Sequence, residues 1–139
     1  MERKLREPDT FNYIYNWFNN ELKTVFDIDV FEKPFPVKTG YEFYTKNNIQ
    51  VLLIRLEDLT DTGATAISEF LNLDGPLLLK KGNIRAENQE SEAYEDVLKN
   101  LRVEPALCIE IYNSRFVRQF YDEDYIRKFI SKWTSSCVG

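Results

Sequence analysis

The sequence contains no histidine, only five glycines and only two cysteines. Histidine is the commonest general base near neutral pH and the commonest metal ligand, so its absence removes the usual chemistry of both kinds. Cys108 and Cys137 are far apart in the chain and do not form a zinc-binding pattern. We therefore expect no metal site, and two isolated thiols favour a reducing, cytoplasmic setting.

Further absences concern phosphates, membranes and nucleic acids. The five glycines form no phosphate-binding loop of the pattern G-x-x-x-x-G-K-[ST]. No apolar run of about 18 residues is present, and residues 1–7 have no apolar core of a signal peptide. The net charge of −5 argues against nucleic acid and anionic membranes as partners. We expect neither nucleic-acid binding nor membrane insertion.

The residues that are present predict one domain spanning residues 1–139, with 43% hydrophobic residues available for a core. Apolar residues recur every three or four positions in several segments, which predicts helices. Asp9 or Thr10 is expected to cap the first helix, Asp61 or Thr62 another, and Asp122 the last. The predicted helical segments are 11–26, 64–71, 91–101, 105–120 with an interruption near 113–114, and 123–133.

A β-hairpin is predicted between the first two helices. Residues 41–45 alternate polar and apolar, residues 49–56 are almost continuously apolar, and Asn47 and Asn48 lie in the turn between them. The apolar run is typical of a strand buried on both faces, as in parallel sheets. Residues 28–36 or 77–79 could add a third strand. The expected fold class is α+β, mostly helical with a small sheet.

The apolar strand ends at Arg55, which is followed by Glu57 and Asp58. Adjacent carboxylates diverge at a strand end, so they do not form an acid/base pair. We expect one of them to cap the next helix or to hold the corner by hydrogen bonds. Arg55 either pairs with a carboxylate at the strand end or faces a cleft, and we predict the pairing.

The turn at residues 80–85 is the strongest anion-binding candidate. Lys80, Lys81 and Arg85 surround Gly82, whose backbone N–H group can donate to an anion. Charge clusters are more often only solvated, so both interpretations stay open. These four residues are our candidate cofactor-binding residues, and no catalytic residue is assigned.

Several stretches together resemble the sulfotransferase-like family of putative capsular polysaccharide synthesis proteins, over roughly residues 11–134. A strand, a Glu-Asp-Leu corner and the helix after it carry most of the likeness. The similar stretches are 29–35 (DVFEKPF), 40–44 (GYEFY), 52–59 (LLIRLEDL), 66–73 (AISEFLNL) and 112–121 (YNSRFVRQFY), with Lys132 and Trp133.

This resemblance covers only the C-terminal half of such a protein. It implies a P-loop-type α/β fold that uses 3′-phosphoadenosine-5′-phosphosulfate to sulfate a polysaccharide acceptor. The chain departs from that pattern because the phosphosulfate-binding loop is absent and Leu56 replaces the tyrosine that often borders the adenine. Two functions follow: an enzyme part that is inactive without a P-loop half, or a non-catalytic interaction module.

The apolar strand also bears on partners. An uncovered strand edge beside apolar surface invites pairing with another chain. We therefore expect either self-association or binding to the missing N-terminal P-loop half.

Overall fold

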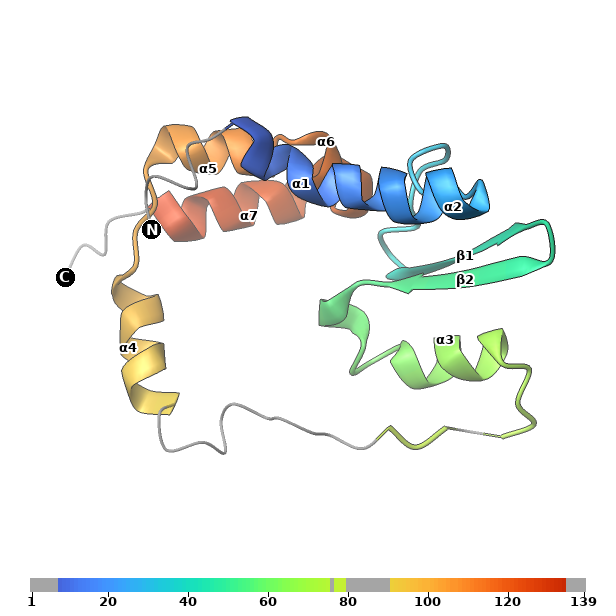
Figure 1. Cartoon of the computed structure of the whole chain (residues 1–139). Helices are drawn as coiled ribbons and strands as arrows, with labels where there is room; N and C mark the ends of the chain where they lie inside the picture. The colour runs from blue at the N-terminus through green and yellow to red at the C-terminus, as the bar shows by residue number, and fades with distance from the viewer. Residues whose placement is uncertain (1–7, 76, 80–90, 135–139) are drawn as a thin grey trace.

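The computed structural model describes residues 8–75, 77–79 and 91–134. The described part is mostly helical with one small sheet, so the predicted α+β class is confirmed (Figure 1). No helix in it is long and apolar enough to cross a membrane. The elements are α1 (Pro8–Phe18), a π-helical turn η2 (Asn19–Lys23), α2 (Thr24–Phe26), β1 (Tyr41–Lys46), β2 (Ile49–Ile54), a 3-10 turn η3 (Leu56–Asp58), α3 (Gly63–Phe70), α4 (Ser91–Asn100), α5 (Pro105–Tyr112), α6 (Arg115–Phe120) and α7 (Glu123–Thr134).

The predicted hairpin is confirmed, with β1 and β2 antiparallel and Phe43 opposite Leu52. Asn47 and Asn48 take φ angles of 47° and 64°, the left-handed conformation that a tight two-residue turn requires. Among the described residues the sheet has only these two strands, and neither 28–36 nor 77–79 adds a third.

The apolar run was also expected to be buried on both faces, as strands of parallel sheets are, and this expectation is wrong. Every residue of β2 is half-buried except Gln50, which is exposed. Alternate residues Val51 and Leu53 pack against the core. Phe43, opposite Leu52, stacks on Phe70 of α3 with ring centroids 6.1 Å apart, which places α3 on the other face. Figure 1 shows the hairpin between α3 and the layer formed by α1 and α2.

The core joins the segment after α2 to the hairpin and to α6. Its buried members are Ile28, Val30, Phe35, Tyr44 and Phe120, with Phe18, Phe31 and Phe116 packed around them.

The first helix extends from Pro8 through a π-helical turn to Phe26. Asp9 and Thr10 therefore lie inside it, and the predicted cap there is wrong.

Two of the C-terminal helices, α5 and α7, begin where the sequence predicted, and the predicted interruption near 113–114 separates α5 from α6. Pro105 is the first residue of α5, and Ser114 caps α6 by accepting a hydrogen bond from Val117 N at 3.4 Å. Asp122 Oδ1 accepts from Tyr125 N at 2.8 Å and caps α7. Cys108 is a buried thiol, 2% exposed, and burial raises its pKa.

Candidate functional site

The predicted anion-binding turn, with Lys80, Lys81, Gly82 and Arg85, lies outside the described residues. Within the described residues, the densest set of polar contacts lies where β2 ends. We call it the Arg55 corner, formed by Gly40, Arg55, Glu57, Asp58 and Tyr121.

Arg55 holds three segments of the chain together. Its Nε donates to Asp58 Oδ2 at 2.5 Å, which confirms the predicted pairing at the strand end. Its Nη2 donates to the carbonyl of Val37 at 2.7 Å, and its Nη1 to the carbonyl of Phe120 at 3.0 Å. The guanidinium also lies 5.4 Å from the ring centre of Tyr121. Since the side chain is only 15% exposed, these contacts replace most of its hydration.

Gly40 and Asp58 fix the shape of this corner. The Gly40 carbonyl accepts from Arg55 N at 2.9 Å, and Gly40 has a φ of +81°. A Cβ at Gly40 would overlap the Asp58 carboxylate. Thr62 precedes α3 and donates from its hydroxyl to the Asp58 carbonyl at 3.0 Å. Asp58 therefore holds the corner by hydrogen bonds, as the sequence predicted for one carboxylate of the pair.

Glu57 points to a different set of partners. Its Oε1 accepts from the Tyr121 hydroxyl at 3.0 Å and from the Tyr125 hydroxyl at 3.3 Å. Burial and then the Glu57 charge raise the pKa of Tyr125 to about 12, and burial and the same carboxylate raise the pKa of Tyr121. Both phenols therefore stay protonated and donate at neutral pH. Glu57 is an exposed residue, and no hydrogen bond to its Oε2 is found in the described part of the chain, so this oxygen can accept from a ligand hydroxyl.

An aromatic column supports the two tyrosines. Tyr121 stacks on Tyr125 with centroids 4.3 Å apart, and Tyr125 stacks on Phe129 at 4.2 Å. Arg55 covers the Tyr121 end, and Lys132 Nζ lies 5.5 Å from the Phe129 ring centre. The phenol donors therefore have little freedom to move away from Glu57.

A groove of about 490 Å³ lies between the turn at 34–37 and the junction of α6 and α7, in the size range of ligand sites. It includes Phe35 and Tyr121, so it borders the Arg55 corner. Its polar lining is already engaged in part, because Arg118 contacts Glu123 at 2.6 Å. Its lining residues are Pro34, Phe35, Val37, Arg118, Gln119, Tyr121, Asp122, Glu123 and Ile126.

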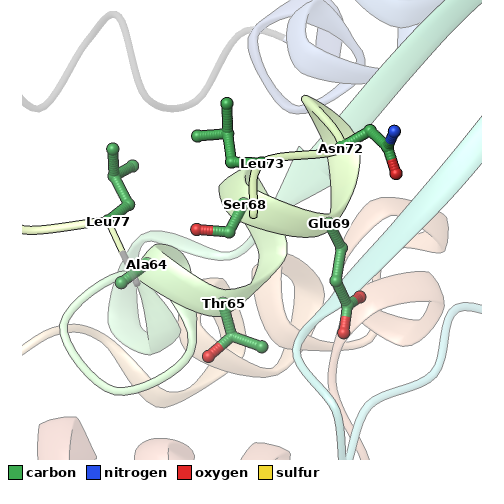
Figure 2. A pocket seen from close by; sticks show the side chains of 7 residues that line it. All are labelled: Ala64, Thr65, Ser68, Glu69, Asn72, Leu73 and Leu77. Carbon is green, nitrogen blue, oxygen red and sulfur yellow. The ribbon is translucent and has the colours of Figure 1, made fainter. Parts of the chain in front are cut away.

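A second pocket of about 400 Å³ lies along α3 (Figure 2). Figure 2 shows Leu73 and Leu77 on one side of it and Glu69 pointing away from them. Glu69 is its sole ionisable residue and accepts from the Tyr41 hydroxyl at 3.1 Å. This pocket offers no set of groups for chemistry, and the described residues contain no cluster of potential metal ligands.

Sequence reasoning found the Arg55–Asp58 pair but missed the partners of Glu57. Tyr121 and Tyr125 lie 64 and 68 residues from Glu57. Tyr121 lies between α6 and α7 with an extended backbone, so its spacing of four from Tyr125 is not a helical repeat, and nothing local connects either tyrosine to a distant carboxylate.

The fold and the site define an α+β protein with an exposed carboxylate held by two phenols at the end of a hairpin. A family model described as "putative capsular polysaccharide synthesis protein" matches residues 6–122. The chain therefore belongs to this family, whose name suggests a role in capsular polysaccharide synthesis. No curated protein and no solved structure matches the chain.

Proposed function

We propose that the chain takes part in capsular polysaccharide synthesis as the acceptor-holding part of a sulfuryl-transfer protein. Family membership supports a role in polysaccharide synthesis, and the resemblance around residues 52–59 supports sulfuryl transfer as the reaction. The observation that carries the proposal is the Glu57 carboxylate, fixed by two phenols with one oxygen left for a ligand hydroxyl.

In this proposal, Glu57 Oε2 accepts a hydrogen bond from one hydroxyl of the acceptor saccharide. The hydroxyl oxygen attacks the sulfur of the donor while its proton passes to Glu57. The bond between sulfur and the phosphate oxygen breaks, and adenosine 3′,5′-bisphosphate leaves with the electron pair. Tyr121 and Tyr125 are positioning residues, because they hold the carboxylate and do not contact the acceptor.

The donor by resemblance is 3′-phosphoadenosine-5′-phosphosulfate. This sequence contains no phosphate loop, so we assign most of the donor contacts to a separate P-loop part. Lys80, Lys81, Gly82 and Arg85 are proposed to add contacts to the donor phosphates. The chain by itself is then inactive and binds the nucleotide weakly.

The test combines two titrations of the chain. Isothermal titration with adenosine 3′,5′-bisphosphate is expected to give no saturation in the low micromolar range. A desulfated capsular oligosaccharide is expected to shift the NMR amide signals around Glu57, Tyr121 and Tyr125. Replacing Glu57 with Ala should weaken that binding about tenfold, the value of a hydrogen bond to a charged group.

Asp61→Ala is the matched control. Asp61 is an exposed carboxylate of the same loop, and its side chain has no contact in the described part of the chain. Its loss should leave saccharide binding unchanged. Tight nucleotide binding would contradict the assignment of the donor to another part. Equal binding by the Glu57→Ala variant would contradict the acceptor site.

A non-catalytic interaction module is the second candidate function. The observation in its favour is that two leucines lie mostly exposed, Leu56 at 81% and Leu78 at 91%. Under this alternative, a partner protein binds the chain and the Glu57→Ala variant has no effect on function.

A further inference from the structure

The two strands of the hairpin each have an outer edge, on the side away from the other strand. In an antiparallel pair, alternate residues bond to the partner strand, and the residues between them direct their backbone N–H and C=O groups outward. The bond from Arg55 N to the Gly40 carbonyl, at 2.9 Å, continues the ladder of β1 and β2 and fixes this alternation. The outward residues of β2, which we call the β2 edge, are Gln50, Leu52 and Ile54.

The outer edge of β1 is blocked by charged side chains. By the same alternation Phe43 faces outward there, and its N–H group donates to the Glu42 carboxylate at 2.9 Å. Lys33 contacts that carboxylate at 3.3 Å. Another strand could pair with β1 only by displacing these groups, and charges placed in this way protect a sheet edge from pairing.

The β2 edge has no such protection. No residue from Ile49 to Ile54 is charged. In the described part of the chain, the backbone groups of the β2 edge make no hydrogen bond, and no third strand lies beside them. Helix α3 lies on a face of the hairpin, where Phe70 stacks on Phe43, and no backbone hydrogen bond joins it to this edge.

We propose that the β2 edge pairs with the β2 edge of a second copy of the chain, so that two hairpins form one continuous sheet. A two-fold axis between the copies brings the same edge together in antiparallel orientation. With the axis at Leu52, Gln50 of each copy lies opposite Ile54 of the other. In this register every outward backbone group of both edges has a hydrogen-bond partner. The inference is independent of the proposed function.

The side chains of β2 agree with this register. Leu52 of one copy lies beside Leu52 of the other on the face that carries α3. On the opposite face, where Val51 and Leu53 pack against the core, Val51 of one copy lies opposite Leu53 of the other. Apolar cross-strand pairs of this kind stabilise a sheet, and the paired segments bring no like charges together. A hairpin of two strands is marginal by itself, so the added strands supply what each copy lacks.

Amide hydrogen exchange at two concentrations of the unmodified chain tests the pairing. At the concentration where sedimentation shows association, the amides of Gln50, Leu52 and Ile54 should exchange at least about tenfold more slowly than in the dilute chain, because exchange then requires dissociation. The amides of Tyr41 and Thr45, which face outward on β1, should not change. Association without slower exchange at the β2 edge would overturn the inference. A monomer at every concentration, or slow exchange that does not depend on concentration, would also overturn it.

Gln50→Pro removes one outward donor and leaves the bonds between β1 and β2 in place. Thr45→Pro is the matched control, because Thr45 is also exposed, lies opposite Gln50 and faces outward on β1. Proline is tolerated on edge strands. We expect Gln50→Pro to weaken association at least about tenfold, since the two-fold axis doubles each lost hydrogen bond, and Thr45→Pro to have no effect. Equal association of the two variants would contradict the proposal. The exchange measurement uses no variant, so it decides the question even if a proline prevents folding.

Discussion

Arg55 illustrates how one side chain can connect distant parts of a small protein. Its guanidinium donates to a carboxylate three residues away and to two carbonyl groups that lie 18 and 65 residues away. Arginine suits this role because its planar fork can donate in several directions at once. The loss of Arg55 would leave Asp58 and two carbonyl groups without these donors.

We therefore predict that Arg55→Ala lowers the free energy of unfolding by about 3 kcal/mol, the cost of breaking a mostly buried charged pair. Urea unfolding measures it. Arg118→Ala is the control, because Arg118 is 48% exposed and its pair with Glu123 contributes less than about 1 kcal/mol. Equal losses in the two variants would show that the Arg55 contacts add no special stability.

Gly40 gives a second prediction at this scale. Alanine at a φ of +81° is strained, and its Cβ would meet the Asp58 carboxylate. Gly40→Ala should cost at least about 2 kcal/mol. Gly75→Ala is the matched control, because no atom lies within 4 Å of a Cβ placed there, and its effect should stay within about 1 kcal/mol. Chemical denaturation of both variants measures the loss in the free energy of unfolding. A loss at Gly40 as small as that at Gly75 would mean that the Arg55 corner adjusts to the added Cβ.

The tyrosines predict how stability depends on pH. Burial and the Glu57 charge raise the pKa of Tyr125 to about 12, and burial with Glu42 and Asp29 does the same for Tyr44, against 10.0 for a free phenol. The folded chain thus holds these protons more tightly than the unfolded chain. Their stabilising contribution is complete below pH 10 and is lost as the pH rises toward 12.

Unfolding midpoints measured from pH 9 to about pH 11.5 should therefore fall. The fall should be smaller in the double variant Tyr44→Phe, Tyr125→Phe, which lacks both titrating groups. The same slope in that variant would show that other groups cause the loss.

At the scale of the element, α7 depends on its first residues. Asp122 Oδ1 accepts from Tyr125 N and satisfies one of the free donors at the start of the helix. This cap also sets where Tyr125 lies, and Tyr125 in turn donates to Glu57. A change at Asp122 should therefore affect both the helix and the candidate site.

Asp122→Ala should lower the free energy of unfolding by about 1 kcal/mol, as for other caps. Asp124→Ala removes a carboxylate from the same turn, but that side chain is 92% exposed and caps no backbone group, so its effect should be smaller. Thermal unfolding compares the two. A larger loss from Asp124 would contradict the cap as the main contribution.

At the scale of the whole molecule, apolar surface remains exposed. The described part of the sheet has two strands, and Leu56, Leu71, Leu78 and Val97 are each more than half exposed. Such surface in a small protein favours association. Charge repulsion opposes it only weakly at a net charge of −5.

We predict that the chain self-associates at micromolar concentration. Sedimentation velocity should show a mass above 16.5 kDa that grows with concentration. Leu56→Ser should weaken this association, while the exposed polar substitution Thr65→Ser should not. A single species at 16.5 kDa, independent of concentration, would show that the exposed leucines are not an interface between copies.

The sequence by itself determined the local features. Pro105 begins a helix, Asp122 caps another, and Asn47 with Asn48 forms the turn, because each of these effects depends on residues within a few positions. The pairing of Arg55 with Asp58 was predictable for the same reason, since the two are three residues apart.

Only the tertiary structure decided the rest. The apolar run at 49–56 predicted a strand buried on both faces, but β2 is only half-buried, because the core covers one face and the short helix α3 lies on the other. The donors to Glu57 come from α7 and from the residue after α6, far away in sequence. Caps and turns depend on residues within a few positions, so a short sequence pattern predicts them. Contacts such as those to Glu57 depend on how distant segments bury their apolar faces together, which no short pattern predicts.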